Sequence, residues 1–132
     1  MGISEKEIEE YVKAFGKEPQ EQSSVWAVTM PSMLSKVVFG PMSTLTDMKF
    51  NIIHKAKNGY MIIAVDSFTG KLRPEHIWLE KDQIKNLQFK KRLISYRMSI
   101  EVPEGKLVYR VNKVTAGAKW QKENVLRLVN QE

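Results

Sequence analysis

The pattern of apolar and polar residues has a helical period near the start of the chain. Ser4 and Glu7 can form a capping box, in which each side chain binds a free backbone N–H of the first turn. Gly16 is placed to end the helix. The spacing therefore predicts an amphipathic helix over residues 4–15, followed by a polar linker up to residue 24. One face of this helix carries Ile8, Tyr11, Val12 and Phe15, at the i, i+3, i+4, i+7 spacing.

Residues 48–66 carry the strongest hairpin signal. Two apolar runs flank Asn58-Gly59, and both of these residues tolerate the positive φ of a type I′ turn. With this pair as the loop, Lys57 faces Tyr60 and Ile52 faces Val65. The expected core face carries Phe50, Ile52, His54, Ala56, Met61, Ile63 and Val65. The opposite face carries Asn51, Ile53, Lys55, Lys57, Tyr60, Ile62 and Ala64, and its apolar members are expected to meet the first helix or another chain.

Further strand signals precede and follow this hairpin. Residues 25–42 predict one broken or bent strand, or a strand and a short helical turn, because Pro31 interrupts the first apolar run. Residues 94–102 alternate without a fault, which is typical of a half-buried antiparallel strand, and Pro103-Glu104-Gly105 predicts the turn after it. Other short strands are predicted at residues 76–79, 84–91 and 107–112. A last helix is predicted over residues 116–130, with Thr115 as its N-cap and an apolar stripe of Trp120, Val125, Leu128 and Val129.

This order of elements predicts an α+β fold. A sheet with one apolar face must close or be covered, so we expect a bent antiparallel barrel of about seven strands capped by the C-terminal helix, with an extra N-terminal helix. The predicted division is residues 1–24 for the N-terminal helix and linker, and residues 25–132 for the barrel with its C-terminal helix. The residues expected to fill the barrel are Phe50, Ile52, Ile63, Met98 and Ile100.

Four segments carry a resemblance to a known family: FNIIHKAKNGYMIIAVD, IWLEKDQIKNLQFKK, YRMSIEVPEGKLVYRVNK and WQKENVLRLVNQ. Together they resemble the bacterial pleckstrin-homology-like (PH-like) domains over residues 48–130, with residues 25–42 supplying the first strand. The resemblance implies a seven-stranded bent barrel with a C-terminal helix. In eukaryotic pleckstrin-homology domains a basic strand–loop region binds phosphoinositide head groups, so the resemblance also draws interest to the basic hairpins. The acidic N-terminal helix lies outside the family's pattern.

Composition excludes several kinds of chemistry. The chain of 132 residues has no cysteine, which excludes disulfides, cysteine nucleophiles and cysteine-ligated zinc. No apolar run reaches the roughly 18–20 residues that span a bilayer, and the acidic N-terminus has no apolar segment of a Sec signal peptide. We therefore expect a cytoplasmic protein, with the inner face of the membrane as a second location.

The positive charge is unevenly placed. Residues 1–25 hold three basic and six acidic residues, for a net charge of −3, whereas the rest of the chain holds 18 basic and nine acidic residues, for +9. If the two hairpins that carry most of these cations are close in space, they form a basic patch suited to anionic groups. The alternative is a solvated strand edge, in which lysines block unwanted sheet pairing. The candidate patch is Lys55, Lys57, Tyr60, Lys85, Lys90, Lys91, Arg92 and Arg97.

Signals for catalysis and for bound cofactors are weak. His54 falls on the predicted core face, and Glu75 and His76 point to opposite faces of a strand, so neither histidine predicts a metal site or an acid–base pair. Phosphate-binding glycine loops, the GxSxG elbow and HExxH are all absent from the sequence. We expect no cofactor, no metal and no enzymatic activity.

The favoured function is non-catalytic binding or scaffolding, through protein–protein contact or an anionic surface. Self-association through the N-terminal helix or a protein partner is expected, and contact with an anionic membrane is a further option. One rival is a small enzyme with an unrecognised pocket. A second rival is weak binding of nucleic acid, which is disfavoured because basic and aromatic residues interleave only sparsely.

Overall fold

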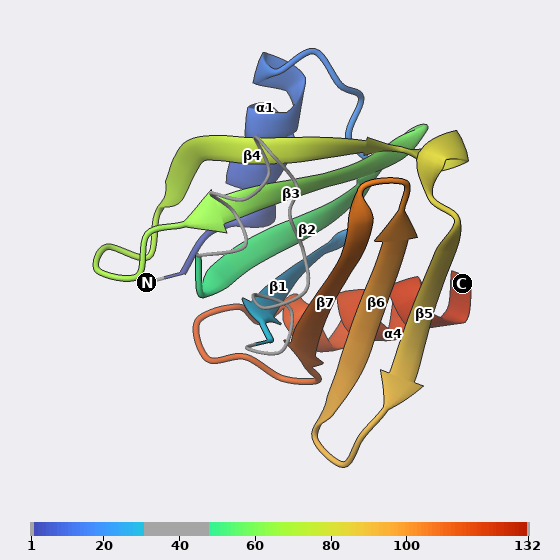
Figure 1. Ribbon diagram of the computed structural model, residues 1–132. Helices are drawn as coiled ribbons and strands as arrows, with labels where there is room; N and C mark the ends of the chain where they lie inside the picture. Colours follow the sequence, from blue (N-terminus) through green and yellow to red (C-terminus); the bar gives the residue numbers. More distant parts are fainter. Residues whose placement is uncertain (1, 31–47, 132) are drawn as a thin grey trace.

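Among the residues that the computed structural model describes, seven antiparallel strands form one open sheet and two helices pack against it (Figure 1). The structure describes residues 2–30 and 48–131. The strand order is β4-β3-β2-β1-β7-β6-β5, so β4 and β5 are the edges and the expected barrel is not closed. The coarse prediction of an α+β fold with seven strands and a helix at each end of the chain is confirmed. The elements are α1 (Glu5–Ala14), β1 (Ser24–Thr29), β2 (Phe50–Ala56), β3 (Gly59–Val65), β4 (Leu72–Glu80), a 3₁₀ turn (Lys81–Gln83), β5 (Asn86–Lys91), β6 (Ser95–Val102), β7 (Gly105–Asn112) and α4 (Gln121–Gln131).

Within the described residues the predicted strand positions are close to the observed ones, and the largest difference is in β4. β4 begins at Leu72 and includes Pro74, whereas the sequence predicted a strand only from residue 76. As the edge strand of the sheet, β4 tolerates a residue without a backbone N–H. The second half of the predicted first strand, residues 37–39, lies outside the described residues.

Two apolar cores lie on opposite faces of the β2–β3 hairpin. The main core is enclosed by the bent sheet and contains Ile53, Tyr60 and Ile62 together with Met98 and Ile100. The second core lies between the hairpin and α1. It consists of Ile3, Ile8, Val12, Ile52, Ala56, Met61, Ile63 and Val65. Every residue of β3 is consequently buried, so this hairpin has no solvent face.

The predicted filling of the barrel is wrong in part. Met98 and Ile100 lie in the main core, but Ile52 and Ile63 lie in the second core and Phe50 packs at its margin. The residues of each hairpin face were grouped correctly. However, the face predicted to fill the barrel packs against α1, and the opposite face fills the main core. Both faces of the hairpin are apolar because α1 covers one of them, so the pattern of the hairpin alone could not show which face looks inward.

The turn of the β2–β3 hairpin differs from the predicted type I′ turn by one residue. Ala56 pairs with Gly59 and Lys55 with Tyr60, so the loop residues are Lys57 and Asn58. Asn58 has a φ of 71°, whereas Gly59 belongs to β3. An added Cβ at Gly59 would collide with the carbonyl oxygen of Leu79 and come within 2.6 Å of the indole of Trp78 on β4. Gly59 is therefore needed for the close approach of β4 and not for its turn conformation.

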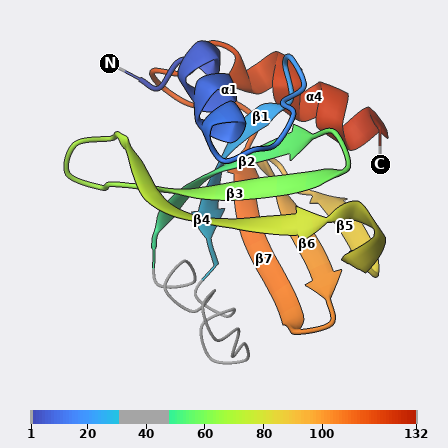
Figure 2. The same cartoon turned by 90° about the horizontal axis from the view of Figure 1, so that it is seen from above.

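The two helices lie next to each other on one side of the molecule (Figure 2). α1 has the predicted capping box, since the Ser4 hydroxyl accepts from the Glu7 N–H at 3.1 Å and the Glu7 carboxylate accepts from the Ser4 N–H at 3.1 Å. The Asn124 side chain of α4 donates to Glu5 at 2.9 Å, which ties the two helices together. Neither helix in the described ranges is long and apolar enough to cross a membrane.

α4 begins later than the sequence predicted, at Gln121 and not near residue 116. Thr115 is not its N-cap, because Thr115 and Ala118 form an isolated β-bridge and Gly117 has a φ of 81°. The Gln121 side chain, fully buried, accepts from the Trp26 N–H at 2.8 Å and donates to the carbonyl of Asn112 at 2.9 Å. These bonds fix the first turn of α4 across β1 and β7. Val125 and Leu128 of α4 then enter the main core.

Candidate binding surface

Three cations stand side by side across β5, β6 and β7. Lys90 pairs with Arg97, and Arg97 pairs with Arg110, so the three side chains share the face of the sheet opposite the main core. Lys90 and Arg110 are exposed and Arg97 is half-buried. Within the described part of the chain, no carboxylate lies at ion-pairing distance from any of the three. We call Lys90, Arg97 and Arg110 the cation row.

Like charges directly opposite one another in a sheet destabilise it. The cation row is therefore not explained by the stability of the fold. One end of the row also borders a hollow of about 220 Å³. Its lining residues are Met30, Arg92, Ser95, Tyr96, Arg97 and Arg110. Three arginines line this one hollow, and guanidinium groups are donors suited to carboxylate or phosphate oxygens.

A second cationic region is a cleft of about 510 Å³ between the β2–β3 turn and the start of β5. We call it the lysine cleft, after Lys55, Lys57, Lys81 and Lys85 that line it. Two of these cations already have partners inside the chain. The Lys57 ammonium lies 3.3 Å from the Glu18 carboxylate, and that of Lys55 donates to the Gln131 side-chain oxygen at 3.0 Å. The lysine cleft is thus partly committed to contacts within the protein.

The basic patch expected from the sequence is divided by the structure into these two regions. Lys55, Lys57 and Lys85 lie at the lysine cleft, whereas Lys90, Arg92 and Arg97 lie at the cation row and its hollow. Lys91 pairs with Tyr96, so it projects toward the opposite face of β5 from Lys90. Tyr60 was expected beside the lysines on an outer face. It does lie opposite Lys55 and lines the lysine cleft, but it is 5% exposed and belongs to the main core, so the face is not an outer one.

Sequence reasoning missed Arg110 and Lys81. The signal for Arg110 was present in the turn at Pro103 and Glu104, because this two-residue loop places Val102 opposite Gly105 and hence Arg97 opposite Arg110. Lys81 reaches the cleft through the 3₁₀ turn between β4 and β5. A turn at Lys81-Asp82 was expected from the sequence, but its position beside the β2–β3 turn depends on contacts between strands.

The apolar stripe of α1 packs on its own domain. Ile8 and Val12 are fully buried in the second core, Tyr11 is half-buried and Phe15 is 45% exposed. Ile53 and Ile62, the apolar residues expected to meet this helix or another chain, lie in the main core instead. Three of the four residues proposed as an interaction helix are thus used within the fold, and Phe15 is the member most accessible to a partner.

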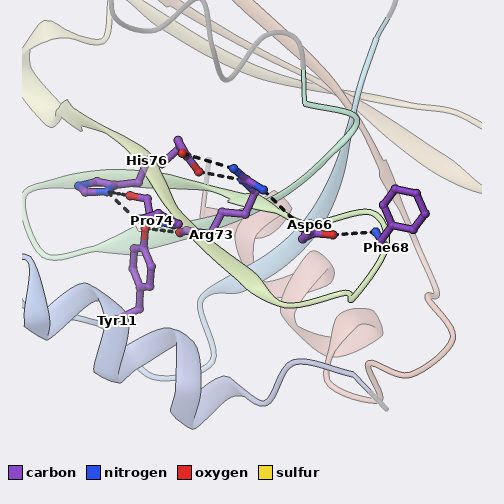
Figure 3. A network of polar contacts seen from close by, with 7 residues as sticks. Tyr11, Asp66, Phe68, Arg73, Pro74 and His76 are labelled. Carbon is purple, nitrogen blue, oxygen red and sulfur yellow. Dashed lines mark hydrogen bonds and ion pairs between the residues drawn. The ribbon is translucent and has the colours of Figure 1, made fainter.

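A polar network fastens α1 to β4 (Figure 3). The Tyr11 hydroxyl donates to the carbonyl of Arg73 at 2.7 Å and lies 3.3 Å from Nδ1 of His76. Burial raises the pKa of Tyr11 to about 12, and the negative charge of Glu75 acts in the same direction. The Phe15 ring packs at 4.1 Å from the His76 ring. His76 therefore serves as part of the helix contact.

Arg73 forms ion pairs with the two carboxylates next to this network, those of Asp66 and Glu75. Its guanidinium donates to Glu75 at 2.8 Å and lies 3.3 Å from an Asp66 oxygen (Figure 3). Asp66 also accepts from the backbone N–H groups of Thr69 and Phe68, and these bonds, with Arg73, hold its carboxyl pKa below the ordinary value. The arrangement stabilises the β3–β4 turn and leaves no acid–base pair between Glu75 and His76.

His54 on β2 is enclosed by the fold. It is fully buried, its Nε2 accepts from the Gln20 N–H at 3.1 Å, and its Nδ1 lies 2.7 Å from the Ser24 hydroxyl. Since Nε2 accepts, the neutral ring carries its proton on Nδ1 and donates it to Ser24. Burial lowers the pKa of His54 to about 4, so the ring is neutral at physiological pH.

Neither the side chains of these regions nor a comparison with known proteins points to a particular reaction. No group of three or more potential metal-ligating side chains occurs among the described residues. No family model, no curated protein and no solved structure matches the chain. A function can therefore be inferred only from the geometry of the chain itself.

Proposed function

We propose that this protein is a non-catalytic binding domain that attaches to an anionic surface through the cation row. The observation that carries the proposal is the placement of Lys90, Arg97 and Arg110 in directly opposed positions without an acidic partner in the described part of the chain. An anionic partner would neutralise their mutual repulsion, so binding gains both the new attraction and the relief of the old repulsion.

A PH-like architecture is part of this proposal. It is supported by an antiparallel sheet of seven strands that bends around one core, with a C-terminal helix packed at β1. The role expected of such a domain is positioning rather than chemistry. The polar contacts near His54 and His76 and within the Asp66–Arg73–Glu75 network connect elements of the fold to one another. They therefore serve structure and not catalysis, which fits a positioning domain.

The proposal is tested by neutralising equal charge at two places. One variant is Lys90→Gln/Arg97→Gln/Arg110→Gln, and its matched control is Lys57→Gln/Lys81→Gln/Lys85→Gln in the lysine cleft. Both variants lose three positive charges, so any effect of net charge alone is the same in both. The probe is heparin, used as a defined polyanion, with affinity measured by isothermal titration calorimetry across a range of salt concentrations.

We expect the cation-row variant to lose more than about tenfold in affinity and to show a shallower salt dependence, since each cation at an anionic surface contributes about 1 kcal/mol. The lysine-cleft variant should lose much less. Equal losses in the two variants would mean that heparin senses only net charge, and the proposal would then be wrong. Single-stranded DNA, titrated in parallel, tests the rival function: affinity for DNA far above that for heparin would favour nucleic-acid binding.

A further inference from the structure

Three large apolar side chains lie bare at the end of the sheet next to the cation row. Leu93 is 91% exposed, Ile94 is 73% exposed and Val114 is 68% exposed. Leu93 and Ile94 are the two loop residues of the β5–β6 hairpin, since the Arg92 N–H donates to the Ser95 carbonyl at 2.8 Å. We call Leu93, Ile94 and Val114 the apolar tip.

The apolar tip is a built feature and not a loose loop end. Lys113 joins its two parts, because its backbone N–H donates to the carbonyl of Ile94 at 3.0 Å and its ammonium donates to that of Leu93 at 3.1 Å. Lys113 also stands 5.4 Å from the centre of the Tyr96 ring. These contacts hold Val114, which follows Lys113, beside the hairpin loop, and the same residues line one shallow depression of the surface.

The choice of loop residues runs against ordinary turn chemistry. Two-residue hairpin loops favour Asn, Asp and Gly, which are small, polar and tolerant of positive φ. Here the loop holds Leu and Ile, neither of which has positive φ, and both expose apolar surface to solvent. Exposed apolar residues that are gathered in one place, next to polar ones, mark contacts with a membrane or another protein.

Three cations lie next to the apolar tip. Arg92 immediately precedes Leu93, Lys113 binds the loop, and Arg110 lines the same depression as Leu93 and Val114. The carboxylates of β6 and of the turn after it, Glu101 and Glu104, lie at the opposite end of the strands, where Figure 1 shows the β6–β7 turn. Apolar groups with cations beside them match a bilayer with anionic lipids, whose head groups are negative and whose interior is apolar.

We propose that the apolar tip inserts into the interface of an anionic membrane, with the cation row and Arg92 held against the lipid phosphates. This inference rests on the proposed function, because it names the anionic surface that the cation row meets. The lipid head groups supply the negative charge that the cation row requires. Burial of Leu93, Ile94 and Val114 in the membrane adds a hydrophobic contribution to the binding. Peripheral proteins need two such contributions, since neither charge nor a few apolar groups alone gives stable attachment.

The experiment measures co-sedimentation with sucrose-loaded vesicles of equimolar phosphatidylglycerol and phosphatidylcholine, and with vesicles of phosphatidylcholine alone. The wild-type chain should sediment with the anionic vesicles only. Leu93→Ser/Ile94→Ser should lower the partition coefficient by about tenfold or more, because the apolar surface of two side chains is no longer buried. The matched control is Phe68→Ser, which removes a 100% exposed apolar side chain at the β3–β4 turn and should leave partition unchanged.

A second readout follows insertion itself. Because the chain has no cysteine, Ile94→Cys and Phe68→Cys each give a single site for an environment-sensitive fluorophore. Anionic vesicles should shift the emission of the label at position 94 to the blue and leave that at position 68 unchanged.

Three results would overturn the inference in distinguishable ways. Binding to anionic vesicles without any effect of Leu93→Ser/Ile94→Ser, and without a blue shift at position 94, would remove insertion and leave the proposed function standing. Heparin binding that depends on the cation row, combined with no vesicle binding, would exclude the membrane and retain an anionic partner of another class. If the cation-row and lysine-cleft variants bind heparin equally, the proposed function fails, whatever the vesicles show.

Discussion

The β2–β3 and β5–β6 hairpins have the same construction and opposite surroundings. Both consist of two antiparallel strands joined by a two-residue loop. In the first hairpin all residues of β3 are buried, whereas in the second the outward-facing residues of β5 are exposed and the inward-facing Leu87 and Phe89 are only half-buried. The two loops show the reverse pattern: the buried hairpin has the polar loop Lys57-Asn58, and the more exposed hairpin has the apolar loop Leu93-Ile94. Apolar surface is thus hidden where a helix covers the sheet and displayed where the sheet ends.

This contrast separates residues that maintain the fold from residues available for a partner. The β2–β3 hairpin is covered by α1, and both ring nitrogens of its buried His54 have hydrogen-bond partners inside the protein. The cation row on β5, β6 and β7 has no acidic partner among the described residues, and its positions oppose like charges. The first region should respond to mutation through stability, and the second through binding.

The largest effect is expected where α1 meets the sheet. Ile8→Ala should lower the free energy of unfolding by about 2–5 kcal/mol, because it removes a fully buried side chain from the second core and leaves a cavity. Leu93→Ala removes a side chain that is 91% exposed and should change stability by less than about 0.5 kcal/mol. Urea unfolding followed by circular dichroism measures both. Similar losses in the two variants would erase the distinction between the hairpins.

The next effect concerns Gly59, where β3 meets β4. Gly59→Ala should destabilise by up to about 3 kcal/mol, because the new Cβ would press on the Leu79 carbonyl and the Trp78 indole. Asn58→Gly is the matched control at the neighbouring loop residue and should be neutral or slightly stabilising, since glycine accepts the positive φ without strain. Thermal unfolding measures the two melting temperatures. Their order would be reversed if glycine were required at position 59 for the turn and not for the close approach of β4.

Sequence reasoning reached the local elements more surely than their surroundings. The capping box of Ser4 and Glu7 and the alternation of β6 are local signals, and both are present in the structure as predicted. The inward face of the β2–β3 hairpin was misassigned because both of its faces are apolar, and only the position of α1 tells them apart. A pattern along one strand cannot contain that information, since it depends on contacts between distant segments.

The candidate surface was predicted in composition and not in arrangement. The basic residues were recognised, but the structure places them in two regions, and one of the expected members, Tyr60, is buried. Arg110 follows from strand register, which the Pro103-Glu104 turn fixes. The apolar tip was hidden in the sequence because Ile94 continues the alternation of β6 and was read as a core position, whereas it is a loop residue that is 73% exposed.

The pH dependence of stability should report the burial of His54. Its pKa is about 4 in the folded protein and 6.5 in the unfolded chain, so below pH 6.5 the unfolded state binds the proton and the folded state does not. The free energy of unfolding should have its full value above pH 6.5. Below that pH it should fall by about 1.4 kcal/mol per pH unit, which gives a loss of about 2 kcal/mol at pH 5. Urea unfolding of the wild type and of His54→Gln measures this, and the variant should lack most of the decline. A variant with the same slope would assign the decline to other groups.

The smallest effect has a sign that distinguishes binding from folding. Arg97→Gln should raise the free energy of unfolding by a few tenths of a kcal/mol, because it removes the like charges facing Lys90 and Arg110. Added salt should narrow the difference from the wild type by screening that repulsion. The control is Lys106→Gln on the same pair of strands: Lys106 lies opposite Glu101, so this variant should be slightly less stable.

Arg97→Gln should also weaken binding to anionic vesicles, while Lys106→Gln should have little effect. A variant that gains stability and loses binding identifies a position kept at a cost to the fold, as expected at a functional surface. Loss of stability in Arg97→Gln would instead mean that Arg97 supports the fold through its packing, and the cation row would lose the argument that sets it apart from an ordinary solvated edge.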